Sequence, residues 1–92
     1  MDVRKQPPGV YLSLAETYAE SGNYKKAIEY YKKVFAVRGR YPVAQMGLAE
    51  VYEKMGEYDL AVKEYHSLSE LDDEEIRIRA LDGIKRIKEK RK

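Results

Sequence analysis

The chain has 92 residues, of which 43% are hydrophobic and 37% are charged, and its length fits one domain. This balance is too apolar for a disordered tail, and no run approaches the ~18 consecutive apolar residues that a membrane span requires. The absence of cysteine excludes a disulfide scaffold, a zinc finger and a thiol nucleophile, and fits a reducing compartment such as the cytoplasm. The first twenty residues lack the basic-then-apolar order of a secretory signal.

The net charge of +2 conceals an asymmetry along the chain. Residues 77–92 carry eight basic and two acidic residues, whereas residues 1–76 carry ten basic and fourteen acidic ones. An acidic body is therefore followed by a basic C-terminal segment.

Displacing the sequence by 34 residues aligns it with itself and reveals a duplication, because nine residues recur unchanged at this spacing. The recurring pairs are Pro8 and Pro42, Leu14 and Leu48, Ala15 and Ala49, Glu16 and Glu50, Tyr18 and Tyr52, Gly22 and Gly56, Tyr24 and Tyr58, Ala27 and Ala61, and Tyr31 and Tyr65. We predict a flexible N-terminus at residues 1–7, one unit at 8–41, a second at 42–73, and a capping helix with a basic tail at 74–92.

The first unit has the hydrophobic spacing of two amphipathic helices. Positions i, i+3, i+4 and i+7 of the first helix are apolar, at Tyr11, Leu14, Ala15 and Tyr18. Gly22 is suited to end this helix, because the residue just past a helix commonly adopts a left-handed conformation that glycine tolerates. The same spacing indicates a second helix, with apolar residues at Tyr24, Ala27, Ile28, Tyr31 and Val34.

The second unit repeats the arrangement, with Pro42 suited to the first turn of its first helix. Its alanines stand at the same places as those of the first unit, which predicts close helix–helix approach. A fifth helix is expected from about Asp73, which offers an N-terminal cap, and its apolar stripe is Ile76, Ala80, Ile84 and Ile87. Nothing predicts a strand. The expected fold class is all-α, a helical-hairpin solenoid of about five helices.

These residues carry a family resemblance. Tyr11-x-x-Leu14-Ala15-x-x-Tyr18, followed by Gly22, Tyr24 and Ala27-x-x-x-Tyr31, resembles the tetratricopeptide repeat. Gln45-x-x-Leu48-Ala49-x-x-Tyr52, followed by Gly56, Tyr58 and Ala61-x-x-x-Tyr65, resembles it again. The likeness extends over residues 8–73. Tyr11 and Gln45 replace the usual tryptophan of the family, and Gly39 and Asp73 stand where a closing proline is common.

The resemblance implies a protein–protein interaction module whose first helices line a concave groove for an extended or helical peptide. The residues it places there are Leu12, Glu16, Ala19, Glu20, Met46, Glu50, Glu53, Lys54 and Arg77. Leu12, Glu16 and Gly47 stand near the places where one branch of the family uses cationic and amide side chains to bind the carboxyl ends of chaperones, so that activity is not expected. A groove with acidic and apolar rows instead favours a basic, aliphatic segment.

Other chemistries find little support in the sequence. His66 and Ser67 are adjacent, and adjacent helical residues do not face each other, so no serine–histidine pair is predicted. The acidic run from Glu70 to Glu75 lacks the glycine and spacing of a calcium loop and fits helix capping. We therefore expect no enzyme activity, no cofactor and no metal site.

Two alternatives remain open at this stage. The basic segment could contact nucleic acid through phosphates, with Lys85, Arg86, Lys88, Lys90, Arg91 and Lys92 as the candidate residues. The chain could also be part of a longer array or self-associate weakly through its uncapped first helix, because stacked repeats gain stability from their neighbours and usually number three or more.

Overall fold

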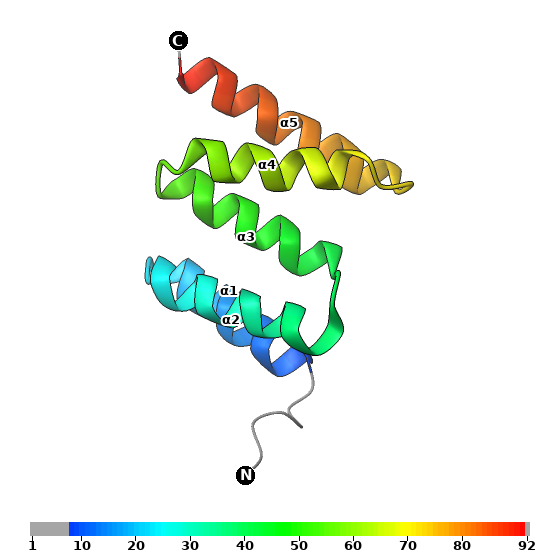
Figure 1. Cartoon of the computed structure of the whole chain (residues 1–92). Coiled ribbons are helices and arrows are strands. Elements are labelled where there is room, and N and C mark those ends of the chain that lie inside the picture. The colour runs from blue at the N-terminus through cyan, green and yellow to red at the C-terminus, as the bar shows by residue number, and fades with distance from the viewer. Residues whose placement is uncertain (1–7, 92) are drawn as a thin grey trace.

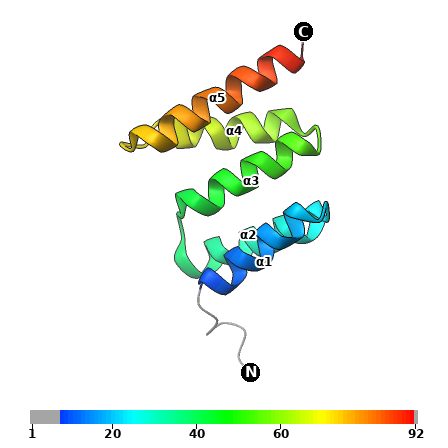
Figure 2. The same ribbon diagram turned by 180° about the vertical axis from the view of Figure 1, so that it is seen from behind.

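A computed structural model describes residues 8–91, so the predicted flexible segment 1–7 and Lys92 lie outside the described residues. The described residues form five α-helices and no strand, which confirms the predicted fold class. The helices are α1 (Pro8–Glu20), α2 (Tyr24–Arg38), α3 (Pro42–Lys54), α4 (Tyr58–Ser69) and α5 (Glu74–Lys90). Figures 1 and 2 show the α1–α2 hairpin at one end of the stack, the α3–α4 hairpin in the middle and α5 at the other end.

The turn inside each hairpin is built on the glycine that the sequence predicted. The backbone φ angle is 83° at Gly22 and 80° at Gly56, in the left-handed region where any residue with a Cβ is strained. In both hairpins the residue after the glycine donates its N–H to a carbonyl of the preceding helix at 2.9 Å. This bond satisfies a carbonyl that the helix end leaves free, so both hairpins close in the same way.

The starts of α3 and α5 also follow sequence signals. Pro42 occupies the first turn of α3, where its missing N–H costs nothing because that group has no partner inside the helix. Asp73 caps α5, and its side chain accepts a hydrogen bond from the backbone N–H of Ile76 at 3.1 Å. The stacking of the hairpins therefore begins from helices whose ends are locally encoded.

Two hydrophobic clusters hold the stack together, and α3 contributes to both. The first cluster joins α1, α2 and α3 through Tyr11, Ala15, Ala27, Tyr31, Val34, Ala44, Leu48 and Val51. The second joins α3, α4 and α5 through Met46, Ala49, Ala61, Tyr65, Leu68, Ala80, Ile84 and Ile87. Ala27 and Ala61 have no exposed surface, as close helix contact requires.

A tyrosine ring of each hairpin packs against a glycine of the next helix. A Cβ built on Gly47 in α3 would overlap the phenol of Tyr31, and one built on Gly83 in α5 would overlap the ring of Tyr65. The tyrosines are 34 residues apart, whereas the glycines are 36 apart. The junction from α4 to α5 is thus two residues longer than that from α2 to α3.

This longer spacing shows that α5 repeats the packing positions of α3. At 36 residues, buried positions of α3 align with buried positions of α5: Ala44 with Ala80, Gly47 with Gly83, Leu48 with Ile84, and Val51 with Ile87. The prediction that the last helix keeps little of the repeat was therefore wrong, because the comparison was made at a spacing of 34 only. α5 packs on the second hairpin as α3 packs on the first.

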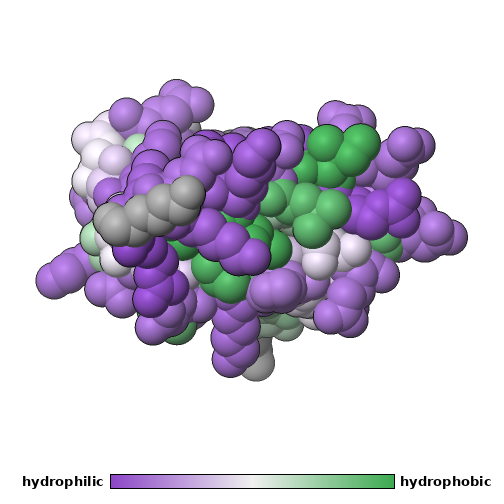
Figure 3. All heavy atoms as spheres, turned by 90° about the horizontal axis from the view of Figure 1, so that it is seen from above, coloured by the Kyte–Doolittle hydropathy of each residue, from purple (hydrophilic) through white to green (hydrophobic). Residues whose placement is uncertain are grey.

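Exposed apolar residues mark both ends of the stack. Leu14 on α1 is 37% exposed, whereas its repeat mate Leu48 is 4% exposed because the first hairpin covers it. On α5, Ile78 and Leu81 are about half exposed. Figure 3, which views the α5 end, shows apolar patches interrupted by hydrophilic side chains. No helix within residues 8–91 is long and apolar enough to cross a membrane.

The glycine contacts predict the effect of adding one methyl group. Gly47→Ala and Gly83→Ala should each lower the free energy of unfolding by about 1–3 kcal/mol, because the tyrosine ring has to move. Gly9→Ala is the matched control, since no atom lies within 4 Å of the added carbon, and it should stabilise α1 by about 0.5–1 kcal/mol. Urea denaturation followed by circular dichroism measures all three. Wild-type stability in Gly83→Ala would contradict the docking of α5.

Candidate functional site

A groove of about 280 Å³ runs across α1, α3 and α5. It is lined by six of the nine residues that the sequence assigned to a groove: Glu16, Ala19, Glu20, Met46, Glu50 and Lys54. They are joined by Tyr31, Pro42, Val43, Gly47, Val51, Ile76 and Arg79. The structure thus brings the two predicted first helices together on one face, and α5 extends the same face.

The other three assigned residues lie elsewhere. Leu12 is half-buried and packs against the first hydrophobic cluster. Glu53 is only 7% exposed and lies beneath α5. Arg77 is exposed but does not line the groove, which takes Arg79 from α5 instead. Residues two apart on a helix point about 200° away from each other, so only one of these arginines can face the groove.

Three carboxylates and a phenol dominate the electrostatics of the groove. Burial, with the charges of Glu16, Glu50 and Glu20, raises the pKa of Tyr31 to about 12. The Tyr31 hydroxyl therefore keeps its proton at neutral pH and can both donate and accept a hydrogen bond. Sequence reasoning assigned this tyrosine to core packing only, since its ring is buried and its spacing is that of the repeat framework.

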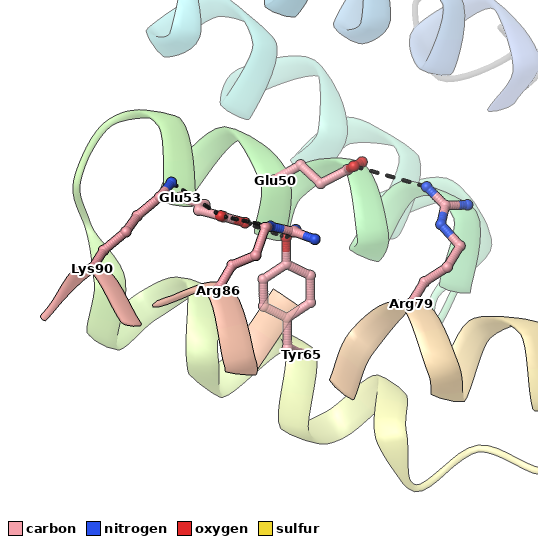
Figure 4. Close-up of polar contacts among 6 residues, drawn as sticks. All are labelled: Glu50, Glu53, Tyr65, Arg79, Arg86 and Lys90. Atoms are coloured by element: carbon pink, nitrogen blue, oxygen red, sulfur yellow. Dashed lines mark hydrogen bonds and ion pairs between the residues drawn. The ribbon is translucent and has the colours of Figure 1, made fainter. Parts of the chain in front are cut away.

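Arg79 is the groove cation that reaches a carboxylate. Its guanidinium lies 3.8 Å from Glu50, and the two side chains are 55% and 45% exposed (Figure 4). Ion pairs this exposed contribute little, because water screens the charges and the side chains lose conformational freedom. Lys54 also lines the groove, so three carboxylates stand against two cations.

Glu53 is the centre of a buried polar cluster, which we call the Glu53 cluster (Glu53, Tyr65, Arg86 and Lys90). Figure 4 shows these side chains meeting between α3, α4 and α5. The Tyr65 hydroxyl donates to Glu53 at 2.8 Å, and Arg86 donates from Nη2 and Nε to its two carboxylate oxygens at 3.0 and 3.1 Å. Lys90 adds a contact at 3.4 Å.

The ionisation of Glu53 follows from these contacts. Burial alone would raise the pKa of Glu53, but hydrogen bonds from Arg86, Tyr65 and Lys90 and the charge of Arg86 outweigh it, so the pKa lies below its ordinary value. The same carboxylate, together with burial, raises the pKa of Tyr65. Glu53 is thus an ionised residue that joins α5 to the second hairpin, and its oxygens are already occupied.

The predicted basic surface is divided by the structure. Arg86 and Lys90 belong to the Glu53 cluster, and Arg91 pairs with Asp59 at 2.9 Å. Lys85 and Lys88 are exposed and make no ion pair with a described residue, while Lys92 lies outside the described chain. Half of the six proposed phosphate contacts therefore hold ion pairs within the molecule.

The described residues gather no group of three histidine, aspartate or glutamate side chains that could hold a metal ion. The groove has side chains that accept and donate hydrogen bonds and an apolar floor, and these are means of binding. At about 280 Å³ it lies near the lower end of ligand sites, which suits one or two side chains of a larger partner.

A family model described as tetratricopeptide repeat matches residues 18–82, which is most of the chain. The match covers the second helix of the first hairpin, the whole second hairpin and the first half of α5. Comparisons with curated proteins and with solved structures gave no match.

The Glu53 cluster predicts a pH-dependent loss of stability. Because the folded pKa is lowered, the carboxylate stabilises the fold above its unfolded pKa of about 4.3, and this contribution is lost as the pH falls through the folded value. Glu53→Gln should therefore cost about 1–3 kcal/mol at pH 7 and much less at pH 3. Urea titrations at both pH values measure the difference. Glu89→Gln, exposed on α5, is the control, and a cost that is independent of pH would contradict the ionised cluster.

Proposed function

This chain belongs to the tetratricopeptide repeat family, and from that premise we propose that it binds a peptide segment of a partner protein in the groove of α1, α3 and α5. Repeats of this family generally mediate protein–protein interaction. The observation that carries the proposal is the convergence of three helices on one groove with acidic and apolar rows.

The apolar row differs in one member from the sequence expectation. Ala19 and Met46 line the groove, and Val43, which is 53% exposed, takes the place expected for Leu12. An exposed valine beside a groove offers surface that a partner can bury. Truncating a central contact of this kind costs about 1–2 kcal/mol of binding energy.

The acidic row sets the charge of the partner. Glu16, Glu20 and Glu50 favour a segment with basic and aliphatic side chains and disfavour a terminal carboxylate. Exposed charges act mostly on orientation and association rate, whereas the apolar row supplies more of the affinity. The basic C-terminal segment offers less support for a nucleic-acid partner, since three of its cations hold ion pairs within the molecule.

Exposed apolar residues on α1 support self-association, or stacking of a neighbouring repeat, as a second proposal. Val10 and Leu14 are 41% and 37% exposed at positions that a preceding hairpin would cover. This contact is compatible with peptide binding, because neither residue lines the groove.

Charge reversal tests the groove. Peptides selected from a random display library should lose affinity for the Glu16→Lys, Glu50→Lys double variant by about tenfold or more, equivalent to about 1.4 kcal/mol. The Glu29→Lys, Glu89→Lys variant makes the same change in net charge outside the groove and should retain binding. Fluorescence anisotropy measures affinity, and circular dichroism checks the fold. Selected peptides that bind both variants equally would refute the groove.

Sedimentation velocity tests the α1 contact. We expect a weak dimer that appears as the concentration rises from micromolar to millimolar, and Leu14→Glu should abolish it. Leu60→Glu, which changes a leucine of similar exposure on α4, should leave the dimer intact. A monomer at every concentration would refute self-association.

A further inference from the structure

We propose that the groove floor at Tyr31 is a subsite for the side chain of an arginine in the partner peptide. This inference rests on the proposed function and names the residue type that the groove selects. It is argued from the polar cluster of the second repeat, in which the same chain already holds an arginine beside a tyrosine.

In the second repeat, Tyr65 lies next to an internal arginine. Its hydroxyl donates to Glu53 at 2.8 Å, and Arg86 Nη2 lies 3.5 Å from the same hydroxyl while binding the carboxylate through two nitrogens. The space beside this tyrosine is small, about 90 Å³, because the cluster fills it. A guanidinium held by carboxylate and phenol is thus one stable solution for this fold.

In the first repeat, the tyrosine is present but its two polar neighbours are changed. Ala19 stands 34 residues before Glu53, so the buried carboxylate is missing there. Glu50 stands 36 residues before Arg86, at the spacing that relates α3 to α5, so a carboxylate replaces the internal arginine. The result is the open groove of about 280 Å³ beside Tyr31.

The Tyr31 hydroxyl is available to a ligand. The residue is only 3% exposed, lines the groove, and makes no hydrogen bond to any residue in the described part of the chain. Within residues 8–91 no fully buried side-chain nitrogen or oxygen lacks a partner, so this unpartnered hydroxyl has to reach the open groove. It is a buried side chain whose polar end faces the groove.

The chemistry around this hydroxyl fits a guanidinium better than an ammonium. Glu16, Glu20 and Glu50 are the carboxylates whose charges act on Tyr31. A guanidinium offers five N–H donors in a planar fork, so it can bind a carboxylate through two hydrogen bonds and still donate to the phenol oxygen. A lysine offers one charge centre without that fork. The subsite should therefore prefer arginine.

Two cations of the chain oppose the incoming charge. Arg79 lies 3.8 Å from Glu50 without reaching Tyr31, and Lys54 lines the same groove. Because Arg79 is 55% exposed, its hold on Glu50 is weak, and a partner arginine can compete for the carboxylate. Removing the charge of Arg79 should therefore increase the affinity for a partner arginine.

The test uses three capped tripeptides that differ in one side chain: acetyl-Leu-Arg-Leu-amide, the same peptide with lysine, and the same peptide with citrulline, which is the neutral isostere of arginine. Amide shifts in heteronuclear NMR spectra locate each peptide and give its dissociation constant. The arginine peptide should shift the amides of Gly47 and Glu50 and bind at least about fivefold tighter than the other two, as a charge-assisted hydrogen bond in a partly solvated site predicts.

Variants separate the subsite from general charge attraction. Tyr31→Phe should reduce the arginine preference and leave the citrulline peptide unchanged, whereas Tyr24→Phe, outside the groove, should have no effect. Arg79→Gln should strengthen the arginine peptide about twofold or more, as loss of a weak competing charge predicts. Equal binding of arginine and citrulline peptides at the groove would overturn the subsite and leave the groove proposal standing. No groove shift with any peptide at millimolar concentration would overturn both proposals.

Discussion

The contact of a tyrosine ring with a glycine on the following helix is the constraint on which the rest of the structure depends. At Gly47 and Gly83 the missing Cβ lets Tyr31 and Tyr65 lie against the helix backbone. A larger residue would push the helices apart, and the interior is packed too densely to absorb such a change without rearrangement. The contact fixes how far α3 lies from the first hairpin and α5 from the second. It also places each tyrosine hydroxyl at the same point between successive helices.

What surrounds each hydroxyl then decides whether that point is closed or open. Glu53, Arg86 and Lys90 close the second site, where the carboxylate is desolvated and accepts four hydrogen bonds. Buried ion pairs add little net stability, because desolvation of the charges offsets much of their attraction. Removing one partner is costly nevertheless, since a charge is left unpaired. The cluster therefore acts chiefly to fix the position of α5, and it uses cations that the basic segment would otherwise present to a polyanion.

The repeat spacing explains how much of this was predictable. The turns at Gly22 and Gly56 and the buried alanines follow from local patterns that recur at 34 residues. The burial of Glu53 does not, because its repeat mate is Ala19 and its partner Arg86 is 33 residues away in a helix with a different spacing. The choice of Arg79 over Arg77 depends on the rotation of α5, which is set by Gly83 packing on Tyr65. Sequence patterns give helices and faces, whereas the phase of one helix against another needs tertiary contacts.

The two repeats thus differ in polar side chains while sharing one backbone arrangement. α3 and α5 present Glu50 and Arg86 at equivalent positions, so the same place in the stack carries opposite charges. In the second repeat the opposite charges are both supplied by the chain, and the site is satisfied without a partner. In the first repeat the chain supplies the carboxylate and the phenol but no guanidinium that reaches the phenol. Repeat architecture therefore lets a few substitutions at one position turn an internal polar contact into an open one, while the aromatic–glycine packing beneath it stays unchanged.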